Sequence, residues 1–225
     1  MVRVAVWCKD STAVHSNAEE RRVWVKRGST LLYSSTFDAV LPASASPDDM
    51  YKGTAAHLVE HAMSGGTGSV VCFGAFDSGK TSAMNAVPSW AASPTGADHG
   101  DVDLAPLGIV ARTLCEMHAQ AKATGLRLTL AAIQVYFEMV TDLLHPNASP
   151  SGKRTAAGST LAGASEEEVL DAATGVAMLA SAQMQRATSC AEPGSAHVLV
   201  EVRRPYPRPH ASTPHAHHLP HRRLA

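Results

Sequence analysis

The chain lacks the features typical of membrane, disulfide-rich and nucleic-acid-binding proteins. No apolar run in its 225 residues is long enough to cross a bilayer, so no membrane insertion is expected. The four cysteines are scattered without a C-x-x-C pair, which argues against a disulfide framework and a zinc cage. The formal net charge is -1, which gives no reason to expect a nucleic acid as partner. Aromatic residues make up only 5% of the chain.

What the sequence does contain predicts one folded domain followed by a disordered tail. Hydrophobic residues make up 45% of the chain, and its length suits about one domain. We place a domain at 1–202 and a Pro/His/Arg-rich tail at 203–225, which has too few apolar residues to offset the entropy of ordering. The tail histidines lack cysteine or carboxylate neighbours, so no metal site is expected there. Lys9 and Asp10 interrupt any signal-peptide core, which predicts a cytoplasmic, reduced protein.

Apolar periodicity predicts alternating strands and helices, and therefore an α/β fold with a central sheet and helices on both faces. The predicted strands are 2–7, 23–25, 31–33, 69–73, 126–136 and 196–202, and the predicted helices are 47–63, 109–123 and 165–184. Ser46 as N-cap and Pro47 at the first helical position begin the first helix. Ser165 and Glu168 have capping-box spacing, which predicts the start of the last helix.

One segment carries a motif with a chemical mechanism. It fits G-x-x-x-x-G-K-[ST] at every fixed position: Gly74, Ala75, Phe76, Asp77, Ser78, Gly79, Lys80 and Thr81. The glycines let the backbone wrap around phosphate, Lys80 is expected to reach the β and γ phosphates, and Thr81 is expected to hold Mg²⁺. A predicted buried strand before the loop and a helix start after it give the strand–loop–helix context of a P-loop. Asp77 places a carboxylate inside the loop.

Blocks in the same order along 2–202 resemble the N-terminal part of a kinesin motor domain. They are Val2–Val6, which resembles the first motor strand; Thr36–Leu41, similar to F-x-F-D-x-V-F; Val71–Met84, similar to F-A-Y-G-Q-T-G-S-G-K-T-x-T-M; Gly108–Arg112, similar to G-I-I-P-R; and Ile133–Leu144, similar to L-E-I-Y-N-E…D-L-L. The resemblance implies a P-loop NTPase-like fold, ATP with Mg²⁺ as ligand, and microtubule-stimulated ATP hydrolysis that drives movement. It also implies a cytoskeletal location, with tubulin or a partner motor subunit as partners.

Departures from the family pattern fall at positions that kinesins use for nucleotide chemistry. The family's adenine-binding R-x-R-P reads Trp7-Cys8-Lys9-Asp10 here. The family's switch I, N-x-x-S-S-R-S-H, is degenerate: in an alignment on His197, Gly194 and Ser195 stand where the second serine and the arginine belong. Switch II, D-L-A-G-S-E, does not occur in the 225 residues.

Three functional interpretations follow. The first is a diverged or truncated kinesin-like protein that binds ATP and hydrolyses it weakly or not at all. The second is a non-motile pseudo-kinesin that acts as a structural or nucleotide-binding module. The third is an unrelated P-loop nucleotide-binding protein. No residue is assigned as catalytic, and His197 is expected to begin a strand.

Overall fold

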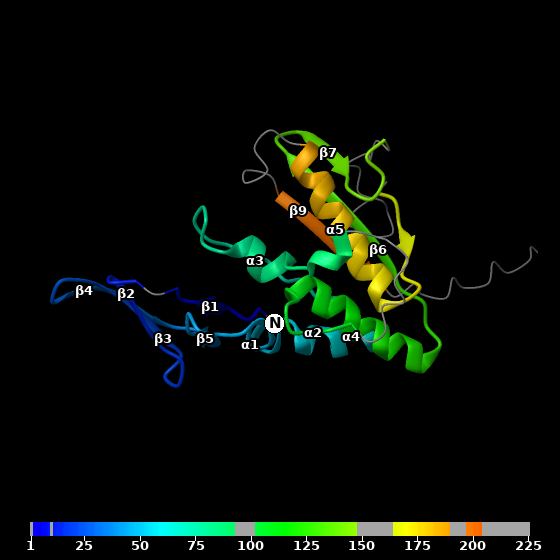
Figure 1. Ribbon diagram of the computed structural model, residues 1–225. Helices are drawn as coiled ribbons and strands as arrows, with labels where there is room; N and C mark the ends of the chain where they lie inside the picture. Colours follow the sequence, from blue (N-terminus) through cyan, green and yellow to red (C-terminus); the bar gives the residue numbers. More distant parts are fainter. Residues whose placement is uncertain (1, 10, 93–101, 148–163, 190–196, 204–225) are drawn as a thin grey trace, which may run out of the picture.

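The computed structural model describes residues 2–9, 11–92, 102–147, 164–189 and 197–203 (Figure 1). These residues combine strands with helices, as the α/β prediction requires. The strands lie in three separate sheets rather than in the single central sheet that we predicted. One reason is that residues 69–73, where we predicted a buried strand, pair with no strand among the described residues.

The N-terminal part contains two of the three sheets. One is a parallel pair of β1 (Ala5–Trp7) and β5 (Ala39–Leu41). The other is an antiparallel meander of β2 (Val14–Asn17), β3 (Arg22–Arg27) and β4 (Thr30–Thr36), which projects away from the helices in Figure 1. The strands predicted at 23–25 and 31–33 are therefore confirmed as parts of β3 and β4, which form a hairpin. Gly28 turns it with a φ of +58°, a conformation that costs glycine little.

The helix predicted at 47–63 is divided in two. α1 (Pro47–Thr54) begins at the predicted N-cap, where Ser46 and Asp49 form a reciprocal capping box. The chain turns at Ala55 and continues as α2 (Ala56–Met63). The start signal was correct because it consists of local hydrogen bonds.

α4 (Ile109–Thr124) confirms the predicted second helix and lies at the centre of the main core. α5 (Ala172–Ser189) packs against it so closely that a β-carbon on Gly175 would lie 2.5 Å from Leu114 Cδ2. Leu114 and Val176 are fully buried there. Burial of each such side chain contributes about 1.5–3 kcal/mol to stability.

The third sheet is built around β6 (Thr129–Tyr136). Its partners are β7 (Met139–Asp142), β8 (Glu167–Glu168) and β9 (His197–Arg203), all antiparallel. The strands predicted at 126–136 and 196–202 are thus confirmed with small shifts. α5 lies along this sheet in Figure 1, and Ala182 packs against Ala132 and Leu143 on one face. The other face, with Ala131 and Ile133, meets no helix among the described residues, so helices on both faces are not found there.

Two further predictions are wrong or need adjustment. Ser165 and Glu168 do not begin a helix, because Glu167 and Glu168 pair with β6. The helix starts at Ala172. Asp171, just before it, caps the first turn, because its carboxylate accepts hydrogen bonds from the backbone N–H and the hydroxyl of Thr174. Arg203 belongs to β9 rather than to the tail, and residues 204–225 lie outside the described residues.

Candidate functional site

The segment Gly74–Thr81 forms a tight loop that leads into the short helix α3 (Lys80–Asn85). Gly79 has a φ of +91° and stands at the N-cap position of α3. A β-carbon on Gly74 would lie 2.8 Å from Ser78 Oγ, so a larger residue here would require the Ser78 side chain to move. The two fixed glycines of the motif therefore both have a steric role in the observed loop.

Lys80 folds back into the loop that precedes it. Its ammonium donates to the Gly74 carbonyl at 3.0 Å and to the Ala75 carbonyl at 2.5 Å. Within the part of the chain that the structure describes, no carboxylate lies within ion-pair distance of this ammonium. The arrangement therefore presents a positive charge inside a curled backbone, which fits a phosphate oxygen as an alternative acceptor.

Asp77 takes a backbone conformation that most residues avoid. Its φ is +56°, in the left-handed region that favours glycine and that aspartate tolerates at some cost. The kinesin pattern has glycine at this position. The departure therefore combines a strained backbone with a negative charge beside the place where phosphate is expected.

Thr81 lies in the first turn of α3 and is exposed. Among the described residues its hydroxyl makes no hydrogen bond, so the oxygen is available as a ligand. A threonine hydroxyl is the oxygen donor that P-loop proteins offer to Mg²⁺. No cluster of three or more metal-ligating side chains occurs in the described ranges, so any Mg²⁺ needs phosphate oxygens and water as further ligands.

The segment before the loop contradicts the prediction of a buried strand. Residues 69–73 form no strand, and the side chains of Val71 and Phe73 are 85% and 97% exposed. Phe76, within the loop, is 85% exposed as well. A strand that is buried in a sheet needs partners on its edges, and none of the described strands supplies one.

Two side chains, from the last residue of β1 and from the segment just after it, lie against the loop. A β-carbon on Gly79 would lie 2.9 Å from Trp7 Cζ3 and 3.1 Å from Lys9 Cε. The Lys9 ammonium lies 5.7 Å from the centre of the Trp7 ring. The alignment with R-x-R-P drew attention to these positions, but the sequence did not indicate their contact with Gly79.

The structure describes only one of the three residues that we aligned with switch I, His197. Gly194 and Ser195 lie outside the described residues. His197 is the exposed first residue of β9, opposite Val135 of β6, which confirms its prediction as a strand start. The Gln183 side chain donates to the Asn85 carbonyl and thereby connects α5 to the end of α3.

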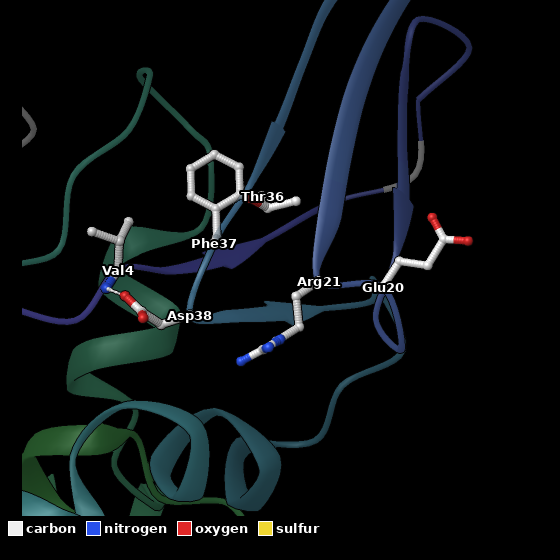
Figure 2. A pocket seen from close by; sticks show the side chains of 6 residues that line it. All are labelled: Val4, Glu20, Arg21, Thr36, Phe37 and Asp38. Atoms are coloured by element: carbon white, nitrogen blue, oxygen red, sulfur yellow. Dashed lines mark hydrogen bonds between the residues drawn. The ribbon is translucent and has the colours of Figure 1, made fainter.

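A hollow of about 610 Å³ lies elsewhere, between the β1–β5 pair and the meander (Figure 2). None of the phosphate-loop residues lines it; its lining residues are Val4, Glu20, Arg21, Thr36, Phe37 and Asp38. The Asp38 carboxylate accepts the Val4 amide at 2.7 Å, so it serves the fold. Sequence reasoning did not predict this hollow.

Arg112 in α4 is a buried charged side chain, with 5% exposure. It donates to the carbonyls of Leu107 and Ala105 and to the carboxylate of Asp48 in α1 at 3.0 Å. These contacts hold the segment before α4 against α1. The residue therefore has a structural role.

None of the helices in the described ranges is both long and apolar enough to span a membrane.

Comparison with known proteins identifies the wider similarity. A family model described as "Kinesin motor domain" matches residues 5–196. The "Kinesin-like protein KIN-UC" of Arabidopsis thaliana is 27% identical over 133 residues, which cover 59% of this chain and 12% of that protein. The "Kinesin heavy chain" of Caenorhabditis elegans is 29% identical over 110 residues, which cover 49% of this chain and 12% of that protein. The chain thus spans only a small part of the length of these relatives.

Proposed function

Because this chain belongs to the kinesin motor domain family, we propose that it binds ATP with Mg²⁺ through the loop Gly74–Thr81 and hydrolyses it slowly or not at all. The observation that carries the proposal is the position of the Lys80 ammonium, which lies inside the curled loop without a carboxylate partner among the described residues. The family assignment adds the expectation that the bound nucleotide is ATP.

The residues of the loop have distinct parts in binding. Lys80 exchanges its bonds to two backbone carbonyls for bonds to phosphate oxygens, which are stronger because the acceptor is charged. Thr81 supplies a hydroxyl oxygen to the metal. Bound Mg²⁺ would neutralise phosphate charge. Asp77 opposes binding by repulsion, so the affinity is expected to be lower than that of a loop with glycine at this position.

Slow hydrolysis is expected because the groups that act on the attacking water are replaced. Phosphoryl transfer depends almost entirely on positioning and electrostatic stabilisation. In the aligned switch I stretch, Gly194 and Ser195 carry neither the arginine nor the paired serines of the family pattern. Loss of one such donor typically costs about 10²–10³ in rate. The remaining loop therefore supports binding better than turnover.

A binding experiment with a matched control tests the proposal. Isothermal titration calorimetry of the full chain with Mg-ATP is expected to show binding that Lys80→Ala lowers by at least about tenfold. Lys26→Ala, which removes an equally charged side chain from β3, is expected to leave the affinity unchanged. Absence of binding by the unaltered chain, or equal binding by Lys80→Ala, would overturn the proposal.

Microtubules are the proposed partner, and the chain is proposed to act there as a non-motile module. Co-sedimentation with microtubules measures this association directly. A phosphate-release assay is expected to remain at background with and without microtubules. Lys80-dependent release stimulated by microtubules would instead support the alternative of an ATP-driven motor, whose switch II must then lie outside these 225 residues.

A further inference from the structure

We propose that Lys9 is a second phosphate-binding residue of the loop and that Trp7 is the residue that positions it. The inference rests on the proposed nucleotide binding and names a contact that the loop motif does not contain. It starts from the surroundings of Gly79 rather than from the motif itself.

The first observation is steric. The side chains of Trp7 and Lys9 both lie close to the α-carbon of Gly79. A β-carbon added to Gly79 would lie 2.9 Å from the Trp7 ring and 3.1 Å from Lys9 Cε. Since Cε is directly bonded to the ammonium nitrogen, the charge of Lys9 lies at the edge of the loop. β1 holds this position because it is paired with β5, and the pairing continues through a hydrogen bond from the Cys8 amide to the Leu41 carbonyl.

The second observation concerns how the lysine is held. Its ammonium lies 5.7 Å from the centre of the Trp7 ring, within the range of a cation–π contact. Trp7 is itself half-buried and packs against the main core, so the ring is a fixed surface. A lysine that rests on a fixed ring loses less side-chain entropy when it binds a ligand than a freely moving one.

The third observation is electrostatic. Lys9 is exposed, and no carboxylate in the described ranges forms an ion pair with it. The loop itself carries the charges of Asp77 and Lys80, and the Lys9 ammonium at its edge adds a second positive charge. An anion of high charge density, such as a di- or triphosphate, satisfies both ammonium groups at once. An uncharged base gains nothing from the charge of Lys9.

Two probes distinguish a phosphate contact from a base contact. Titration calorimetry with Mg-ATP and with Mg-tripolyphosphate, which has no base, is expected to give a loss of about 5–30-fold for Lys9→Ala with both probes. Lys9→Arg is expected to stay within threefold of the unaltered chain. Lys26→Ala serves as the control for a remote lysine.

The positioning role of Trp7 has its own readout. Trp7→Phe keeps an aromatic face and is expected to retain affinity, whereas Trp7→Leu is expected to lose about as much as Lys9→Ala. The double variant Trp7→Leu/Lys9→Ala is expected to bind the probes no more weakly than Lys9→Ala alone. Such non-additive losses of affinity would not result from a general loss of stability. Circular dichroism of each variant checks that it is folded.

Each other outcome overturns the role of Lys9, the role of Trp7 or the proposed function, as follows. If Lys9→Ala weakens ATP alone, Lys9 contacts the base and the inference is wrong. If Lys9→Ala binds both probes as well as the unaltered chain, the inference is wrong while the proposed function stands. If the unaltered chain binds neither probe, the proposed function fails and the inference fails with it. Additive losses for the double variant would overturn the role of Trp7.

Discussion

Replacement of Asp142, the last residue of β7, tests how a buried carboxylate fastens three segments together. The residue is fully buried. One carboxylate oxygen accepts the backbone N–H groups of Leu144 and His145, each at 2.9 Å. The other accepts the Ser165 amide at 2.6 Å, across a separation of 23 residues. The side chain thus ties the turn after β7 to the segment that leads into β8.

The magnitude follows from these three bonds. A hydrogen bond to a charged group contributes about 1.5–3 kcal/mol, and a donor left unpaired costs more. Asp142→Ala leaves three N–H groups without this acceptor, so we expect a loss of about 3–5 kcal/mol, moderated because Leu144 and Ser165 are half-buried and His145 is exposed, so water reaches the donors. Asp142→Asn keeps one carbonyl oxygen but turns an amide NH₂ toward a donor, and we expect a loss of about 1.5–3 kcal/mol.

The assay is urea unfolding followed by far-UV circular dichroism, with a thermal melt beside it. A loss of 3 kcal/mol corresponds to a fall of about 6–12 °C in Tm for a chain of this size. Asp103→Asn is the control, because the Asp103 carboxylate is exposed and accepts a single backbone hydrogen bond. That change is expected to cost under about 0.5 kcal/mol.

The pH dependence supplies an independent check. Burial raises the pKa of Asp142, but the backbone hydrogen bonds to its carboxylate outweigh burial, so the pKa lies below its ordinary value of 3.8. A group whose pKa is lower in the folded state stabilises the fold above the unfolded pKa and loses that contribution as pH falls below it. The stability advantage of the unaltered chain over Asp142→Asn should therefore shrink as the pH falls below 3.8. Equal urea midpoints and equal pH profiles for the two chains would refute the reasoning.

Three further predictions follow from single contacts. Arg112→Ala is expected to cost about 2–4 kcal/mol by urea unfolding, since it removes the donor of two carbonyls and of one oxygen of the Asp48 carboxylate. Lys52→Ala, which removes the exposed partner of the other Asp48 oxygen, is expected to leave the urea midpoint nearly unchanged; similar losses for the two variants would contradict the structural role of Arg112. Asp77→Gly is expected to strengthen Mg-ATP binding in calorimetry by about 3–30-fold, because it removes both the negative charge and the backbone strain. Asp77→Asn removes only the charge and is expected to strengthen binding by less. No gain in affinity from either variant would show that the carboxylate does not oppose phosphate. Gly108→Ala is expected to lower Tm by at least about 4 °C, because its β-carbon would lie 2.6–2.8 Å from the backbone at the end of α3; an unchanged melt would contradict this packing.

The sequence predicted those elements whose determinants are local. The start of α1 at Ser46 and Pro47 depends on hydrogen bonds within four residues, and α4 depends on its own apolar periodicity. Ser165 and Glu168 also have the spacing of a local signal, the capping box, but Glu167 and Glu168 pair with β6 instead of beginning a helix. Long-range pairing of this kind leaves no mark in a short window of sequence.

The candidate site divides in the same way. The loop motif identified Lys80 and its glycines, whose geometry is set within seven residues. The buried strand expected at 69–73 depended on partner strands, and its apolar pattern says nothing about whether those strands are present. The approach of Trp7 and Lys9 to Gly79 joins residues about 70 positions apart, which no spacing rule predicts.

If ligand binding orders the unpaired segment before the phosphate loop, the entropy lost by that segment lowers the ligand affinity. Its residues make no ladder hydrogen bonds within the described structure, and Val71 and Phe73 lie open to water. Fixing the backbone of one residue costs about 1–2 kcal/mol, so ordering two of these residues on binding would weaken the apparent Kd by about 30–1,000-fold. A contact that orders this segment beforehand would raise the affinity for the nucleotide by the same factor. By thermodynamic linkage, bound nucleotide would raise the affinity of that contact by an equal factor.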